Sequence, residues 1–396
     1  MVERMSDTSH GTYDAVVVGG GPAGATAAHA LGSRGHDVLI LDKSSFPRKK
    51  LCGGLVTWKT TQLLEREFGW NHESLGPEDG FEYSTPEYEV HFDGSTVKNG
   101  RSERPYYFAD RRGYDAKLFE AAVSHETVDA LEGAAVTDVD ASTGVVSLAD
   151  SSVVEGRYVV GADGAHSVVR NSLPGFDREA WGDNLAIATE TFVPREAVDI
   201  DPDSLLVHLG FVNWGYGWVF PNRDRLVVGV GGLNRKNTDS FRTLLDRYFD
   251  RLGIDADASS AESRPIPFGN YLTEPTADRA MLVGDAAGFV DAMSGEGIFY
   301  AQRSGELCAH AIDRALGTGK SAPRLYTSYL DESVIPELRL SKLLRPLLWG
   351  GPSALRRPII HTWGAALHRQ WEELVHGTRL YRFLRKRGDP YHTTLP

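Results

Sequence analysis

One segment near the N-terminus, Tyr13–Lys43 (YDAVVVGGGPAGATAAHALGSRGHDVLILDK), constrains the fold more than any other part of the chain. Ala15–Val18 is a short, continuous apolar run, which is typical of a strand buried on both faces. Small and apolar residues fill Ala23–Leu31, as in a helix that lies close to a sheet. Val38–Leu41 has the pattern of a second buried strand. This order of strand, helix and strand predicts a β-α-β unit at the start of an α/β domain with a parallel sheet.

The turn between the first strand and the helix carries a Gly-x-Gly-x-x-Gly pattern at Gly19, Gly21 and Gly24. Gly19 allows the tight turn, Gly21 lets a pyrophosphate approach the backbone, and Gly24 lets the helix pack near the strand. The first turn of the helix offers free N–H groups to phosphate. Asp42, eighteen residues past Gly24, stands where an acid can accept hydrogen bonds from an adenosine ribose. The segment therefore predicts a dinucleotide-binding site of the Rossmann type.

Three later stretches indicate which dinucleotide is bound. ADRRGYDAKLFEAA begins a helix with Arg111, RYVVGADGAHSVVR is an apolar strand ending in Asp163-Gly164, and RAMLVGDAAGFV is another ending at Asp285. In this order the motifs resemble the flavoproteins with a para-hydroxybenzoate-hydroxylase-like fold. The resemblance implies FAD as the cofactor, with Arg111 at its phosphate and Asp285 at its ribityl chain. It also implies that Asp163-Gly164 touches both FAD and the path of the reductant.

The middle of the chain predicts a second domain with a mixed or antiparallel sheet. Strand-like segments separated by turn residues lie at 82–91, 185–193, 204–209, 216–220 and 225–231. We therefore expect an FAD-binding domain made of residues 13–80, 109–180 and 273–320, a substrate-binding sheet domain made of 81–108 and 181–272, a helical and basic C-terminal segment at 321–396, and a disordered lead-in at 1–12.

The stretch NWGYGWVFPNRDR contains three aromatic residues at alternate positions, Tyr216, Trp218 and Phe220, followed by Pro221. Alternate residues of a strand share one face, so the three rings form a row that ends at the proline. This row is either an aromatic stripe of the core or a wall over a long apolar ligand beside the flavin. The sequence pattern alone leaves both interpretations open.

Three stretches resemble geranylgeranyl reductases in particular. They are the Tyr-x-Trp-x-Phe-Pro stretch, the Lys-x-Cys-Gly-Gly stretch at Lys50–Gly54, and the Ser-Gly-Glu-Gly-Ile stretch at Ser294–Ile298. The chain departs from that family at Asn213, where a proline is frequent, and at Asn222, where a lysine is frequent. The residues before Ser294 are Asp-Ala-Met, where the family commonly has prolines. The resemblance implies an FAD-dependent reductase that saturates C=C bonds of a geranylgeranyl or other polyprenyl chain by hydride transfer.

The resemblance also implies the residues of the site. Candidate catalytic residues are Cys52, Tyr216 and Trp218, and the substrate site adds Phe220 and Pro221. No metal site is expected. The candidate cofactor-binding residues are Gly19, Gly21, Ala23, Gly24, Asp42, Cys52, Gly53, Arg111, Val136, Asp285, Gly295, Gly297 and Ile298.

Reduction of an isolated C=C bond needs a hydride on one carbon and a proton on the other, held in line by the site. Tyr216 could orient a water molecule or donate the proton. The Cys52 thiol could donate it instead, or could be a small buried residue that only packs. His166 follows the Asp-Gly strand and is expected at the solvent edge rather than in the role of a base.

The stretch Ser294–Ile298 should lie beside the flavin ring, because it follows the strand that ends at Asp285. Gly295 and Gly297 would allow close approach of the backbone to the isoalloxazine. The helix that starts there would direct N–H groups toward the pyrimidine end of the flavin and stabilise its anionic reduced form. Glu296 is either a catalytic acid or a capping residue of this helix.

The C-terminal segment is basic although the protein is acidic. The net charge is −12, which disfavours nucleic acid as a partner, yet residues 336–396 contain eleven Lys and Arg against four Asp and Glu. Leu340, Leu343, Leu344, Leu347 and Leu348 share one helical face, and Thr378–Arg387 repeats the basic and aromatic character. This segment could rest on anionic lipid or could cap the substrate tunnel.

Two cysteines without metal-type spacing fit a reducing compartment, and the chain has neither a signal-like apolar N-terminus nor a membrane-spanning run. We therefore expect a cytoplasmic protein, with peripheral contact at the inner face of the membrane as an alternative. Its partners would be a polyprenyl lipid and an external electron donor such as NAD(P)H or ferredoxin.

Two other functions fit the same frame. A flavin-dependent monooxygenase or halogenase is one, although halogenases have Trp-x-Trp-x-Ile-Pro where this chain has Tyr216 and Phe220. A lipid-binding flavoprotein without catalytic activity is the other.

Overall fold

The structure is a computed structural model of the chain. It describes residues 12–350 except 199–202 and 257, and in the C-terminal segment 356, 358, 360, 372, 373 and 375–377. The predicted lead-in and the basic stretch Thr378–Arg387 therefore lie outside the described residues, apart from residue 12.

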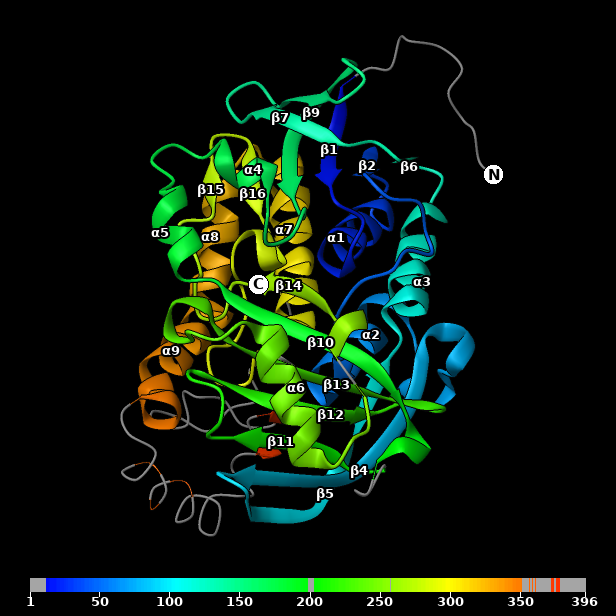
Figure 1. Ribbon diagram of the computed structural model, residues 1–396. Coiled ribbons are helices and arrows are strands. Elements are labelled where there is room, and N and C mark those ends of the chain that lie inside the picture. Colours follow the sequence, from blue (N-terminus) through cyan, green and yellow to red (C-terminus); the bar gives the residue numbers. More distant parts are fainter. Residues whose placement is uncertain are drawn as a thin grey trace.

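A parallel sheet forms the upper half of the molecule in Figure 1. β1 (Tyr13–Val18) pairs in parallel with β2 (Val38–Asp42) on one side and β9 (Val153–Gly161) on the other. β6 (Val128–Glu132) and β16 (Ala280–Leu282) extend the parallel sheet, and β15 (Thr276–Ala277) pairs antiparallel at one edge. The predicted β-α-β start and α/β class are confirmed. The sequence reading did not predict the antiparallel β7 (Val136–Asp140) and β8 (Val145–Leu148), which add to β9.

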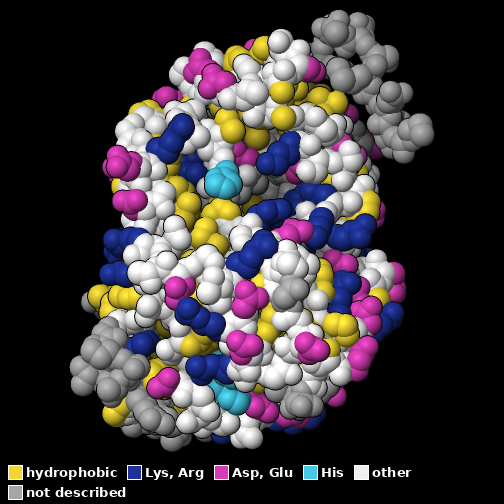
Figure 2. All heavy atoms as spheres, viewed as in Figure 1, with side chains coloured by type: hydrophobic (Ala, Val, Ile, Leu, Met, Phe, Trp, Pro, Cys, Tyr) yellow, Lys and Arg dark blue, Asp and Glu magenta, His cyan; other side chains and the backbone are white. Residues whose placement is uncertain are grey.

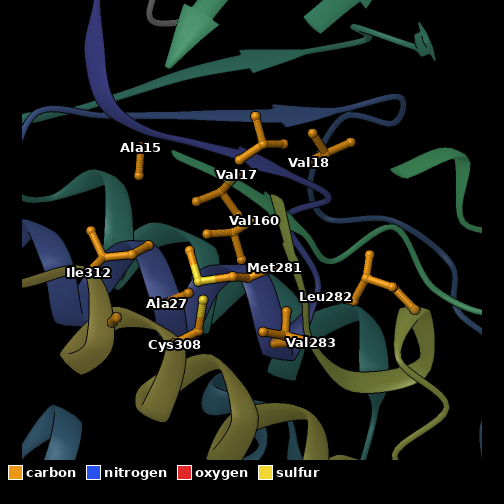
Figure 3. Close-up of a cluster of buried hydrophobic side chains, with 14 of the residues drawn as sticks. Ala15, Val17, Val18, Ala27, Val160, Met281, Leu282, Val283, Cys308 and Ile312 are labelled. Carbon is orange, nitrogen blue, oxygen red and sulfur yellow. The ribbon is translucent and has the colours of Figure 1, made fainter. Parts of the chain in front are cut away.

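Helices α1 (Pro22–Gly32) and α7 (Ile298–Thr318) pack on this sheet and on each other. Gly305 makes the contact close, because a Cβ atom there would lie 2.2 Å from the carbonyl oxygen of Ala23. Figure 3 shows the core between sheet and helices, where Val17, Val160 and Met281 from the strands meet Cys308 from α7. Burial raises the pKa of the Cys308 thiol, so this cysteine is an inert core residue.

The sheet also contacts α3 (Arg111–Val123), α4 (Val168–Asn171) and α8 (Ala322–Ser333). A short helix, α5 (Arg178–Asp183), follows α4 in the chain. α2 (Trp58–Phe68) lies against α7 and leads the chain toward the second sheet.

The lower half contains an eight-stranded, mainly antiparallel sheet in the order β14-β10-β13-β12-β11-β4-β5-β3. Among the strands that the structure describes in this sheet, only β11 and β4 pair in parallel. The 15-residue strand β5 was not predicted, because its charged and glycine-containing sequence STVKNGRSERPYYFA hides the strand pattern. The strands are β3 (Leu55–Val56), β4 (Phe81–Phe92), β5 (Ser95–Ala109), β10 (Ala186–Pro194), β11 (Leu205–Leu209), β12 (Gly215–Pro221), β13 (Arg225–Leu233) and β14 (Glu262–Ile266).

The two faces of this second sheet have different coverings. Helix α6 (Phe241–Leu252) packs its apolar side, including Leu245 and Tyr248, on the outward residues Val219 and Val228. The opposite face carries Tyr216, Trp218 and Phe220 in one row, as the alternation predicts. Helix α9 (Ile335–Trp349) covers one end of this aromatic face. None of the helices that the structure describes has both the length and the hydropathy that a membrane span requires.

Candidate functional site

The glycine turn after β1 forms an open cradle at the N-terminus of α1. Gly19 has φ +104°, a conformation that favours glycine, and a Cβ atom on Gly24 would lie 1.8 Å from the Gly19 carbonyl oxygen. Gly21 is the N-cap of α1, so no side chain caps the helix. The uncapped amides of the first turn are suited to a phosphate group. Ala23 belongs to this turn and is buried.

Charged side chains surround the cradle. Asp42 accepts hydrogen bonds from the backbone N–H groups of Gly20 and Ser44, 2.9 and 2.8 Å away, which fix its carboxylate beside the turn. Arg111 forms a two-pronged ion pair with the buried Asp115, at 2.7 and 3.0 Å, and this pairing raises the pKa of Arg111 despite its burial. Arg111 is thus oriented by Asp115.

Arg48 is a cofactor-site candidate that the sequence reading missed. Its guanidinium lies 3.2 Å from Asp115 and 3.8 Å from Asp42. It also lies 3.2 Å from the place a Cβ atom would take on Gly21. The sequence feature that could have predicted Arg48 is its position in the turn-rich stretch after β2, because an arginine there can reach back to the glycine turn. Figure 2 shows Lys and Arg side chains gathered across the middle of this face of the molecule.

The Gly-Asp turn after β16 packs between α1 and α7. Gly284 has φ +56°, and a Cβ atom there would lie 3.1 Å from that of Ala23 and 3.2 Å from that of Ala301. Its N–H donates to the Ser304 hydroxyl at 2.9 Å. The Asp285 carboxylate lies 3.5 Å from the Cβ position of Gly297. Asp285 and the Ser-Gly-Glu-Gly stretch are therefore neighbours.

The Ser294–Ile298 stretch is held by a buried ion pair. The Glu296 carboxylate pairs with the Lys59 ammonium and accepts a hydrogen bond from the Thr57 hydroxyl at 2.6 Å. Burial raises the pKa of Glu296, and Lys59 opposes that rise. The capping interpretation of Glu296 was wrong, because Gly297 is the N-cap of α7 and no side chain caps this helix. Glu296 instead links the Ser294–Ile298 stretch to the N-terminus of α2 through Lys59 and Thr57.

The aromatic row meets both glycine stretches. A Cβ atom on Gly53 would lie 2.7 Å from the Phe220 ring and 3.5 Å from the indole nitrogen of Trp218. A Cβ atom on Gly295, where φ is +76°, would lie 2.9 Å from the Tyr216 hydroxyl. That hydroxyl donates to the Ser294 carbonyl oxygen. The structure thus brings the Cys52-Gly53 stretch, the aromatic strand and the Ser-Gly-Glu-Gly stretch together.

The remaining predicted residues lie at the edges of this arrangement. Ile298 is the buried first residue of α7, and Pro221 ends β12. Val136 starts β7, which follows β6 beside the end of β2. The Asp163 carboxylate accepts the Val168 N–H at 2.6 Å and so is bound to the start of α4. His166 is exposed, as expected.

A buried acid near the aromatic row was also missed. Glu190 of β10 and Trp218 of β12 lie on either side of Gly229 in β13. A Cβ atom on Gly229 would lie 2.3 Å from the Trp218 ring and 2.7 Å from the Glu190 Cβ atom. The signal was the single acid in the strand AIATETFVP, opposite a strand with the glycines of VVGVGG.

Residues from the C-terminal part of the chain cover the sheet face that carries Tyr216, Trp218 and Phe220. Trp349 of α9 stacks on Tyr216, with ring centroids 5.9 Å apart and an angle of 20° between the rings. Leu348 and Ile360 belong to the same buried cluster, and Val375 packs near Trp218 and Phe220. The sheet face is therefore a covered apolar surface.

The open cradle and the arginines around it fit the pyrophosphate of a dinucleotide, which agrees with known proteins. The chain matches the family described as "FAD binding domain" over residues 12–332. It is 32% identical over 323 residues to the geranylgeranyl diphosphate reductase of Rhodobacter capsulatus, covering 78% of this chain and 77% of the relative. The protein belongs to the geranylgeranyl reductase-like family of FAD-dependent oxidoreductases.

Two further comparisons agree with this membership. The menaquinone reductase of Mycobacterium tuberculosis H37Rv is 30% identical to this reductase-like protein over 348 residues, covering 80% of this chain and 79% of that one. The crystal structure of a geranylgeranyl bacteriochlorophyll reductase-like protein from Thermoplasma acidophilum superposes with a TM-score of 0.73 at 20% identity, covering 88% of this chain and 90% of that one. The structural likeness supports the fold, and the sequence relatives support the family.

Proposed function

We propose that the protein saturates C=C bonds in a geranylgeranyl or other polyprenyl chain, attached to a lipid, a quinone or a related group. The observation that carries this proposal is the row of Tyr216, Trp218 and Phe220 next to the glycine stretches expected at the flavin ring. A long apolar chain would bury its surface against these rings and be kept from water. Relatives with about 30% identity are named geranylgeranyl diphosphate reductase and menaquinone reductase, which supports the same substrate class.

In this proposal the chain's residues hold the cofactor in three places. Gly19, Gly21 and the α1 N-terminus, with Arg48 and Arg111 nearby, would hold the pyrophosphate. Asp42 would accept hydrogen bonds from the ribose, and Asp285 would face the ribityl chain. Bound FAD, once reduced by an external donor such as NAD(P)H or ferredoxin, supplies the hydride.

The substrate-side residues would position the double bond. Gly53 and Gly295 let the aromatic strand approach closely, because a side chain at Gly53 would collide with the Phe220 ring and one at Gly295 with the Tyr216 hydroxyl. The Tyr216 hydroxyl donates to the Ser294 carbonyl, and burial raises its pKa. These two facts favour Tyr216 as a positioning residue rather than the proton donor. Cys52, in the glycine stretch beside the aromatic row, would also help to position the substrate.

We also propose that α9 rests on the cytoplasmic surface of a membrane, from which the substrate would be collected. Its inner side packs Leu348 and Trp349 beside Tyr216, while Leu343 and Leu347 on its outer side are 70% and 40% exposed. Lys342 lies next to them and is also exposed, which suits an anionic lipid surface. One helix would thus separate the membrane from the substrate site.

The proposal is tested by mass spectrometry. The flavin-loaded protein, reduced chemically without oxygen, is incubated with geranylgeraniol in detergent micelles. The proposed function predicts products that have gained two hydrogen atoms for each reduced double bond. A product that has gained oxygen or halogen, or an unchanged lipid, would contradict it.

A further inference from the structure

Glu190 occupies a defined place in the second sheet. It lies directly opposite Glu262 on β14 and directly opposite Gly229 on β13, and Gly229 lies opposite Trp218 on β12. Residues directly opposite one another in an antiparallel sheet project to the same face. Because Gly229 has no side chain, Glu190 and Trp218 approach each other over it. The acid is therefore part of the covered aromatic face.

The surroundings of Glu190 are unusual for a carboxyl group. The residue is only 4% exposed and forms no ion pair with any residue that the structure describes. The groups that face it are the backbone amide of Cys52, the guanidinium of Arg111, the indole of Trp218 and the carboxylate of Glu262. Glu262 itself pairs with Lys49 and Arg264 at the edge of the sheet, which leaves those cations engaged elsewhere.

A buried carboxyl group without a cation partner favours its protonated form. Burial raises the pKa of Glu190 to about 7, and the Cys52 amide and Arg111 offset part of that rise. An acid with a pKa near neutrality can both give a proton and take one back under physiological conditions. A structural carboxylate in an ion pair would not have this property.

We propose that Glu190 is the proton donor of the reduction, an inference that rests on the proposed function above. One carbon of the double bond takes a hydride from the reduced flavin, and the other takes the carboxyl proton of Glu190. The C=C bond becomes a CH–CH bond, the flavin is oxidised by two electrons, and Glu190 is left as a carboxylate. Water then returns the proton to Glu190, and the external donor returns the electrons to the flavin.

The test compares Glu190→Gln with Glu190→Asp and with the control Glu262→Gln, each loaded with FAD. Glutamine keeps the shape of the side chain and removes its acidity, and aspartate restores an acid. Glu262→Gln makes the same change one strand away, at an ion-paired carboxylate near the surface. Carboxyl ¹³C NMR of glutamate-labelled protein gives the pKa of Glu190 without any turnover, and mass spectrometry gives the rate of geranylgeraniol reduction after chemical reduction of the flavin.

We expect one carboxyl signal that titrates near pH 7 in the wild-type protein and is missing from Glu190→Gln. In Glu262→Gln this signal should titrate at a slightly lower pH, because a negative charge that faces Glu190 is removed. We also expect reduction to slow about 100-fold or more in Glu190→Gln, to recover in part in Glu190→Asp, and to change by less than about threefold in Glu262→Gln. Wild-type rates in Glu190→Gln, or a Glu190 signal that titrates like an ordinary glutamate, would overturn the proton-donor assignment alone. A wild-type protein that leaves geranylgeraniol unreduced would overturn the proposed function, and the assignment with it.

Discussion

Two glycines, Gly24 and Gly297, show that the absence of a side chain serves folding at one position and cofactor binding at another. Gly24 leaves no room for a methyl group, because the Gly19 carbonyl oxygen lies 1.8 Å from its Cβ position. At Gly297 the nearest atoms are Val290 and Asp285 at 3.4 and 3.5 Å, and φ is −122°, which any residue can adopt. The first glycine is required by the backbone, whereas the second has room for a side chain on the side where we expect the flavin.

Gly24→Ala should lower the free energy of unfolding by about 4 kcal/mol or more, because backbone atoms would have to move apart. Thermal unfolding of the variant and the wild-type protein measures this loss.

Gly297→Val should keep its fold but bind FAD at least about tenfold more weakly, a loss of about 1.4 kcal/mol. Flavin absorbance after desalting measures this effect. Gly317→Val is the control, since nothing lies within 4 Å of its Cβ position. A yellow Gly297→Val protein with wild-type FAD affinity would show that this loop lies away from the flavin.

Glu190 should make stability depend on pH. Its folded pKa of about 7 lies above the ordinary value of 4.5, so the folded state holds the proton more tightly between these values. The free energy of unfolding should therefore fall as pH rises from 4.5 to 7, by roughly 3 kcal/mol from this group. Urea unfolding at several pH values should show this slope in the wild-type protein and a smaller one in Glu190→Gln. Equal slopes in the two proteins would contradict the raised pKa.

The sequence was informative about residues whose role is local. The glycine turn could be predicted because its spacing alone dictates a tight turn and a close helix. Glu190, Arg48 and Lys59 could not, because each matters through a contact with a distant segment: Trp218 across the sheet, the glycine turn, or Glu296. A strand pattern does not show which residues lie opposite one another, so the pairing of Glu190 with Gly229 required the structure.

Helix α9 has two different faces along its last turns. Trp349 stacks on Tyr216 and Leu348 joins the same buried cluster, whereas Leu343 and Leu347 are exposed. The sequence predicted one apolar face for this helix. In the structure some of its leucines are buried against the second sheet and others are exposed on the surface. This division could not be predicted because the position of the helix on the second sheet fixes which leucines are covered.

Leu343→Glu combined with Leu347→Glu should abolish binding to anionic vesicles of phosphatidylglycerol and phosphatidylcholine. The change removes two apolar contacts worth together about 3 kcal/mol and adds repulsion from the lipid surface. Folding should be unaffected because both side chains are exposed. Co-sedimentation measures the binding, and Val153→Glu, at a 59% exposed valine on β9, is the control. Vesicle binding that persists in the double variant would exclude α9 as the contact surface.

The whole molecule is organised around two sheets, and each sheet contributes a different part of the candidate site. The parallel sheet ends in the glycine turn and the Gly-Asp turn, and the antiparallel sheet presents its aromatic face (Figure 1). The α/β class and most strands were predictable from periodicity. The polar strand β5 and the short β3 were not, because they are held by pairing rather than by their own apolar pattern.

Removal of FAD should lower the stability of the whole protein, because the glycine turn before α1, helix α3 and the start of α7 would all contact the cofactor. Saturation with FAD at about 100 times its dissociation constant should add about 2.7 kcal/mol to the free energy of unfolding. The melting temperature of flavin-free protein, measured with increasing FAD, should rise accordingly. A melting temperature independent of FAD would contradict the placement of the cofactor across these segments.

The most direct measurement is the reoxidation of the reduced flavin by a polyprenyl lipid without oxygen. The protein is reduced chemically, mixed with geranylgeraniol in a stopped-flow instrument, and followed by the flavin absorbance. If the protein is a prenyl reductase, the oxidised flavin spectrum returns with one reduced double bond for each flavin. If the flavin stays reduced until oxygen is admitted, the lipid is not the electron acceptor and the proposed function is contradicted.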